Sequence, residues 1–145
     1  MRALLQRVTS ASVTVDGQTI AAIDRGLVVF LGIFPDDTPG QAEWLADRTL
    51  GLRVFPDVDK PMNASVVDVG GAVLVVSQFT LAADVSRGRR PGFSTAAPPE
   101  LAERLYGDFL DALQARHAPV AAGRFGADMQ VALVNDGPVT FLLER

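Results

Sequence analysis

The sequence predicts a single α/β domain over residues 1–145, with mixed or antiparallel sheets curled like a barrel and two long helices packed outside. Three observations support this fold class. Short apolar runs of strand length are separated by turn signals, and two stretches place apolar residues at helical spacing. The helices and strands do not alternate regularly enough for a doubly wound parallel sheet, so hairpins are expected to dominate. The length suits one domain with a substantial core.

The N-terminal part of the chain is predicted to form strands. Residues 3–8 are followed by 11–15, where apolar and polar residues alternate, and Asp16-Gly17 is a two-residue turn signal before a returning strand at 18–23. After a second turn, residues 27–34 are almost entirely apolar, which favours a strand covered on both faces.

The first helix is predicted to begin after Thr38 and to end near Gly51. Thr38 is a suitable N-cap, Pro39 occupies the first helical position and Gln41 completes a capping box. The residues expected to face the core recur at helical spacing: Ala42, Leu45, Ala46, Thr49 and Leu50.

The middle of the chain is predicted to contain a short strand at 53–55 and a hairpin. Residues 66–69 and 72–76 flank Gly70-Gly71, which is a hairpin turn signal. The segment 82–97 has no regular pattern and is basic at its centre, and a loop of this length in a compact domain is usually functional or mobile.

The last third is predicted to form a second helix and three strands. The helix opens at Pro98-Pro99, and the strands cover 120–125, 129–134 and 139–143. The buried stripe of the helix comprises Leu101, Leu105, Phe109, Ala112 and Leu113.

Composition excludes several kinds of active site. The chain has no cysteine and one histidine, so it has no thiol nucleophile, no disulfide and no zinc site built from Cys/His clusters. His117 lies near the end of the second helix, where an imidazole is expected to cap the last carbonyls. We therefore expect no Ser-His-Asp triad, no metal and no cofactor.

Charge limits the type of nucleic-acid binding. The net charge of −4 argues against broad nonspecific binding, which depends on neutralising many phosphates. One local basic patch, Arg87-Gly88-Arg89-Arg90, is either a solvated loop or a contact for the phosphates of a nucleic-acid end.

There is no leader-like or membrane-spanning segment, so a cytoplasmic location is expected.

Two polar stretches follow apolar strands and are the candidate functional motifs. Ser77-Gln78-Phe79-Thr80-Leu81 follows the apolar run 73–76, and Asn135-Asp136-Gly137-Pro138-Val139-Thr140 follows the run 131–134. The end of a strand is a common place for chemistry, because the strand fixes a side chain that the exit exposes. A Gly-Pro pair taken alone is typical of a tight turn and can hold a cis bond.

These two stretches match in full the signatures of the D-aminoacyl-tRNA deacylases, also called D-tyrosyl-tRNA deacylases. The chain resembles this family from Gln6-Arg7-Val8 through residues 123–129 to its end. The resemblance implies a homodimer that hydrolyses the ester bond between a D-amino acid and the 3′-terminal adenosine of tRNA, which is a proofreading step in translation. It also implies a cis Gly137–Pro138 bond that projects into the partner's pocket and rejects L-amino acids.

The resemblance also assigns roles to individual residues. The catalytic residues on the pocket floor are expected to be Ser77, Gln78 and Thr80. The substrate is expected to contact Phe79 and Met129 as well. Gly137 and Pro138 are expected to contact the substrate and to form the element that rejects L-amino acids. Arg7 is expected to brace the Gly-Pro element, and Arg87, Arg89 and Arg90 are candidates for contacts with tRNA phosphates. Gly92 stands where the family leads us to expect serine, and Ala82 where an aromatic residue is common, so loop contacts can differ here.

The chemistry leaves three routes open. An aminoacyl ester is already activated, so positioning a water molecule and stabilising the oxyanion with backbone N–H groups can suffice. Thr80 as a covalent nucleophile has no visible base in the sequence. The third route is assistance by the 2′-hydroxyl of the terminal ribose, and we favour positioning combined with this assistance.

Two other functions compete with the deacylase. One is a dimeric module that binds RNA ends without catalysis, and it predicts no hydrolysis above a buffer control. The other is a threonine-nucleophile amidase or peptidase for small metabolites, and it predicts activity on esters or amides that lack RNA.

For the deacylase, selection by steric exclusion of the L side chain predicts hydrolysis of glycyl-tRNA, since glycine has no Cβ.

Overall fold

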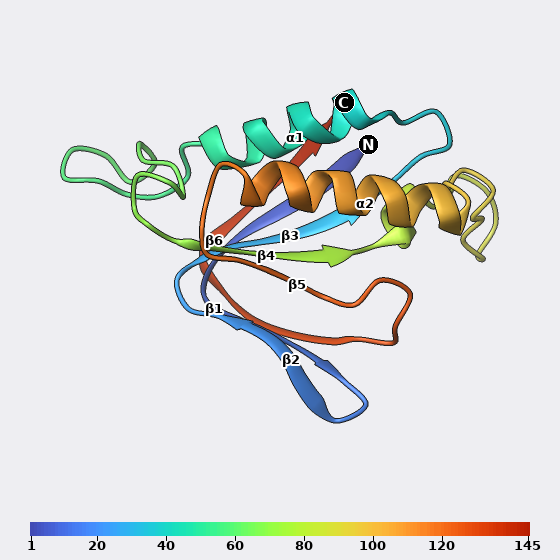
Figure 1. Cartoon of the computed structure of the whole chain (residues 1–145), viewed down its shortest axis with the longest axis horizontal. Coiled ribbons are helices and arrows are strands. Elements are labelled where there is room, and N and C mark those ends of the chain that lie inside the picture. Colours follow the sequence, from blue (N-terminus) through green and yellow to red (C-terminus); the bar gives the residue numbers. More distant parts are fainter.

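The computed structural model describes residues 1–145 and contains one six-stranded mixed sheet with both long helices on the same face (Figure 1). The strands are β1 (Arg2–Val15), β2 (Gln18–Ile23), β3 (Gly26–Gly32), β4 (Ala72–Ser77), β5 (Val120–Ala122) and β6 (Gln130–Glu144). The helices are α1 (Pro39–Gly51) and α2 (Pro99–Gln114), and a short 3₁₀ helix, η1 (Phe79–Ala82), follows β4. The predicted fold class is confirmed. No helix is long and apolar enough to cross a membrane.

The curl of the sheet comes from β1, which is 14 residues long. One edge of β1 pairs with β3 along its first half and with β2 along its second half, while β6 runs along the other edge. The predicted strands 3–8 and 11–15 are therefore one continuous strand. The β3–β4 and β4–β5 pairs are parallel and the others are antiparallel, so the sheet is mixed.

Two apolar cores cover the two faces of the sheet. The larger lies between the sheet and the helices and includes Leu27 and Val29, and the smaller lies inside the curl and includes Val28. Alternate residues of β3 thus point to opposite cores, as side chains on a strand must. The prediction that this strand is covered on both faces is confirmed.

Both helices follow the predicted pattern. The Thr38 N–H donates to the side-chain oxygen of Gln41 at 2.7 Å, and all five residues of the predicted stripe of α1 are buried. In α2, Leu105, Phe109 and Leu113 are fully buried against the sheet side.

The predicted hairpin around Gly70-Gly71 is wrong. Residues 66–70 form turns rather than a strand, because the Ser65 N–H and hydroxyl both bind the Asp68 carboxylate at 2.8 Å and wind the chain. β4 pairs instead with β3 and β5, both far away in sequence. The strand expected at 53–55 is reduced to one bridge between Phe55 and Ala64, and β5 covers only part of 120–125.

Candidate active site

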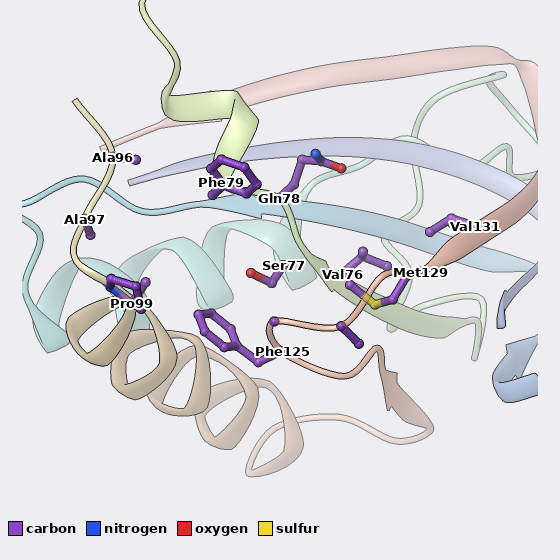
Figure 2. Close-up of a pocket in the computed structure, with 13 residues that line it drawn as sticks. Val76, Ser77, Gln78, Phe79, Ala96, Ala97, Pro99, Phe125, Met129 and Val131 are labelled. Atoms are coloured by element: carbon purple, nitrogen blue, oxygen red, sulfur yellow. The ribbon is translucent and has the colours of Figure 1, made fainter. Parts of the chain in front are cut away.

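A cavity of about 470 Å³ opens at the end of β4, where the first motif leaves the sheet (Figure 2). The Gln78 N–H donates to the Leu31 carbonyl at 2.8 Å and keeps the chain beside β3 as it exits. Figure 2 shows the rings of Phe79 and Phe125 on opposite sides of Ser77. The lining residues are Val76, Ser77, Gln78, Phe79, Ala96, Ala97, Pro99, Ala102, Phe125, Gly126, Ala127, Met129 and Val131. Four residues predicted for the pocket, Ser77, Gln78, Phe79 and Met129, therefore meet in one cavity.

η1 is held in place by close packing against β3 and by a hydrogen bond from Arg2. A Cβ on Gly32, at the end of β3, would lie 2.7 Å from the Cβ of Leu81, so only glycine lets η1 pack this closely. The Arg2 guanidinium donates to the Leu81 carbonyl and to Glu144, each at 2.5 Å. These contacts fix the backbone of the residues that surround the cavity.

Thr80 is exposed and does not line the cavity. Its hydroxyl accepts a hydrogen bond from the Gln78 amide and has no other side-chain partner. The lone imidazole cannot act as its base, because the His117 ring binds the Gly71 carbonyl at 2.7 Å, beyond the opposite end of β4. Gly71 and Ser77 are roughly 20 Å apart at the rise of a β-strand. The prediction that His117 caps the second helix is wrong for its ring, since Arg116 instead binds the Ala112 carbonyl there.

Tyr106 supports the wall of the cavity and was missed by the sequence analysis. Its hydroxyl lies 3.1 Å from the Val75 carbonyl and 3.3 Å from the Gly123 carbonyl, so it joins β4 to the segment that carries Phe125. Burial raises the pKa of Tyr106 to about 12, which keeps the hydroxyl protonated as a donor. In the sequence, the one indication of this role is that the single tyrosine of the chain lies next to the apolar stripe of the second helix.

The second motif forms a bulge inside β6. Gln6 and Val8 of β1 are two residues apart, but their partners on β6, Thr140 and Asn135, are five residues apart. Asn135 closes the bulge by accepting from the Val139 N–H at 2.8 Å and donating to the Thr140 hydroxyl at 2.9 Å.

Gly137 and Pro138 lie at the exposed tip of this bulge. Gly137 has φ +130°, a conformation that side chains rarely allow, and the Gly137–Pro138 bond is cis, as expected. Proline has no N–H to offer a ladder, so the strand can accommodate it only outside regular pairing.

Arg7 makes the contacts expected of a brace for this bulge. It is 8% exposed, and its guanidinium donates to the Asp136 carbonyl at 3.1 Å and to the Val54 carbonyl at 2.6 Å. Its Nη2 atom lies 3.1 Å from where a Cβ on Gly137 would be. The guanidinium therefore packs directly under the Gly-Pro element.

The bulge and the cavity are far apart within the chain. Ser77 is level with Leu31 and Ala3 across the sheet, whereas the bulge is level with Arg7. Four residues along β1 and three strand spacings separate them, which is roughly 20 Å. Gly137 and Pro138 accordingly do not line this cavity.

The three predicted phosphate contacts lie on a neighbouring loop and outside the cavity lining. Asp84 and Gly92 close this loop by two backbone hydrogen bonds of 2.8 Å. Arg87, Arg89 and Arg90 are all exposed, and none forms an ion pair.

Comparison with known proteins then places the chain. The sequence pattern of the family described as D-Tyr-tRNA(Tyr) deacylase matches residues 4–144. The chain belongs to this family. It is 56% identical over 144 residues to a D-aminoacyl-tRNA deacylase of Pseudomonas fluorescens, covering 99% of both proteins. A D-aminoacyl-tRNA deacylase of Methylococcus capsulatus is 57% identical over 143 residues, which cover 99% of this chain and 94% of that protein.

Solved structures agree with this deacylase fold. A protein described as c-Myc DNA unwinding element binding protein superposes with a TM-score of 0.95 at 47% identity, covering 100% of this chain and 99% of that one. A probable eukaryotic D-amino acid tRNA deacylase superposes with a TM-score of 0.83 at 18% identity, covering 98% and 97%. The second likeness concerns the fold alone.

Proposed function

We propose that this protein hydrolyses the ester bond between a D-amino acid and the 3′-terminal adenosine of tRNA, and releases the free amino acid and the tRNA. It is a hydrolase of carboxylic esters that proofreads chirality during translation, in the cytoplasm. The observation that carries this proposal is the cavity that the family's first signature builds at the end of β4. The full-length match to relatives named D-aminoacyl-tRNA deacylase supports it.

The cavity is suited to positioning rather than to covalent catalysis. Its walls are mostly apolar and can shield the ester from bulk water, while Ser77 and Gln78 supply the polar groups. The backbone N–H group of Phe79, a residue that lines the cavity, is the donor proposed for the oxyanion. Water adds to the carbonyl carbon, the ester C–O bond breaks, and the 3′-oxygen takes the proton, with the neighbouring 2′-hydroxyl assisting.

Replacing Thr80 with alanine is expected to leave deacylation within about tenfold of the wild-type rate, because the Thr80 hydroxyl faces no base. Loss of a true nucleophile costs about 10³-fold or more. Single-turnover hydrolysis of D-tyrosyl-tRNA measures the difference. A folded but inactive variant, together with a trapped aminoacyl-enzyme in the wild type, contradicts the positioning mechanism.

Gly137 and Pro138 are proposed to serve the cavity of a partner subunit, because their own cavity is roughly 20 Å away. Apolar side chains on β6 support a subunit contact there: Val134, Phe141 and Leu142 are 56%, 39% and 49% exposed. Exposed apolar groups of this kind are typical of protein interfaces.

Light scattering at assay concentration is therefore expected to give twice the mass of the chain. A Leu142→Lys variant places a charge in the proposed contact and should weaken the dimer and its chiral selection together. A monomeric wild-type protein that retains full activity and full selection would refute the shared site.

Rejection by rigid backbone predicts the substrate range. The two enantiomers differ in the direction of Cβ. A block in the direction of the L side chain still allows glycine and D-amino acids to bind. At equal enzyme concentration, glycyl-tRNA and D-alanyl-tRNA should be hydrolysed while L-alanyl-tRNA is spared by at least about tenfold, a difference of about 1.4 kcal/mol.

The same series of substrates separates the alternatives. A pocket that gripped the D side chain would gain about 0.8 kcal/mol from one methyl group and would handle glycine poorly. Glycyl-tRNA spared along with L-alanyl-tRNA would thus overturn selection by exclusion. No release above the buffer control from any of the three would leave the RNA-end-binding module, and rapid hydrolysis of D-alanine esters without RNA would favour the amidase.

A further inference from the structure

Two phenylalanine rings lie exposed against each other at the mouth of the cavity. Phe79 is 57% exposed and Phe93 is 43% exposed, and their ring centroids are 5.1 Å apart with a tilt of 52°. Phe79 belongs to η1 and also lines the cavity, whereas Phe93 comes from the segment after the arginine loop. A pair of large apolar rings left in water beside a binding cavity indicates an interaction surface.

The position of Phe93 is fixed by three hydrogen bonds of its segment. The Thr95 hydroxyl donates to the Ala82 carbonyl at the end of η1, and the Ala97 N–H donates to the Ile33 carbonyl at 3.0 Å. The Ala96 N–H closes a turn on the Phe93 carbonyl at 3.1 Å. Both rings are thus carried by anchored backbone and form a preorganised surface.

The charge beside the rings defines the kind of partner. Arg87, Arg89 and Arg90 are exposed and unpaired, and the one acidic residue between positions 84 and 92 is Asp84. Ser86 binds the Asp84 carboxylate and lowers its pKa, so this residue stays ionised and the loop still carries a net charge of +2, from three arginines and one aspartate. A partner with flat π faces and closely spaced negative charges matches these features, and single-stranded nucleic acid has both.

We propose that Phe79 and Phe93 form a stacking platform for an unpaired base that precedes the terminal nucleotide, while the arginine loop contacts the phosphates of the same strand. This inference rests on the proposed function only for the identity of the strand, which is the 3′ end of the aminoacylated tRNA. Because Phe79 belongs to both surfaces, a strand whose aminoacyl group fills the cavity passes directly over the rings. Any base can stack, so the platform recognises a single-stranded end rather than a sequence.

The test compares Phe93→Leu with Phe93→Tyr on two substrates. One substrate is the D-tyrosyl ester of adenosine, and the other is the same ester on a short single-stranded oligoribonucleotide ending in adenosine. Leucine keeps an apolar side chain but has no π face, whereas tyrosine keeps the ring. Phe93→Leu should lower kcat/KM on the oligonucleotide ester roughly 5- to 150-fold and leave the adenosine ester unchanged, and Phe93→Tyr should match the wild type on both.

Equal losses on the two substrates would overturn the proposal, because Phe93 would then only support the cavity. Loss of the dimer in Phe93→Leu, measured by light scattering, would also overturn it and assign the rings to a second copy of the chain. Fluorescence titration with the same oligonucleotide lacking the amino acid tests the platform even if no ester is hydrolysed. Failure of the proposed function can therefore be distinguished from failure of the platform. In that titration, changing all three arginines to glutamine should reduce the slope of log K against log salt by about two, because neutralising one single-strand phosphate accounts for about 0.7.

Discussion

Replacing Gly32 with alanine should lower single-turnover deacylation of D-tyrosyl-tRNA by about 100-fold or more. The new Cβ would lie 2.7 Å from the Cβ of Leu81 and 3.3 Å from the Gln78 carbonyl oxygen, so η1 has to move away from β3. Neither neighbour is the far end of a flexible side chain. A displacement of about 1 Å at a positioning site is enough for a loss of this size.

Gly107→Ala is the matched control for this substitution. Gly107 lies inside α2 with no atom outside that helix within 4 Å of the new Cβ, and alanine there should stabilise the helix by about 0.5–1 kcal/mol without changing the rate. Thermal unfolding of both variants separates misplacement of η1 from general unfolding. Wild-type kinetics in a folded Gly32→Ala protein would show that the position of η1 does not govern the reaction.

Replacing Arg7 with methionine should reduce the preference for D-alanyl-tRNA over L-alanyl-tRNA by at least about tenfold. The change removes the donors to the Asp136 and Val54 carbonyls and the group packed under Gly137, so the bulge can move aside for an L side chain. The buried Val54 carbonyl loses its charged partner, and the free energy of unfolding should fall by about 1–3 kcal/mol.

Two further variants control the Arg7 experiment. Arg7→Lys retains the charge but not the planar fork that reaches two carbonyls, and its selectivity should lie between those of the wild type and Arg7→Met. Arg104→Met removes an exposed arginine of α2 and should change nothing. Unchanged rejection of L-alanyl-tRNA by a folded Arg7→Met protein would contradict the bracing role.

Much of the fold could be predicted because local patterns and tertiary contacts agree. Asp16-Gly17 is a turn, the capping residues of α1 precede its buried stripe, and β3 is covered on both faces. Prediction failed where the neighbour along the chain is not the neighbour in space. Gly70-Gly71 has the composition of a hairpin turn, but β4 pairs with strands distant in sequence, and nothing local encodes that pairing.

The sequence by itself determined the fold class, the two motifs and the absence of a thiol, because each of these depends on residue identity and short spacing. Only the tertiary structure decided which motif residues meet. It placed Ser77, Gln78, Phe79 and Met129 around one cavity, left Thr80 outside it, and put Gly137 and Pro138 roughly 20 Å away. It also brought Phe93 against Phe79 and Tyr106 under Val75. These contacts join segments from different parts of the chain, and their distances follow from strand register and helix packing, which no local pattern specifies.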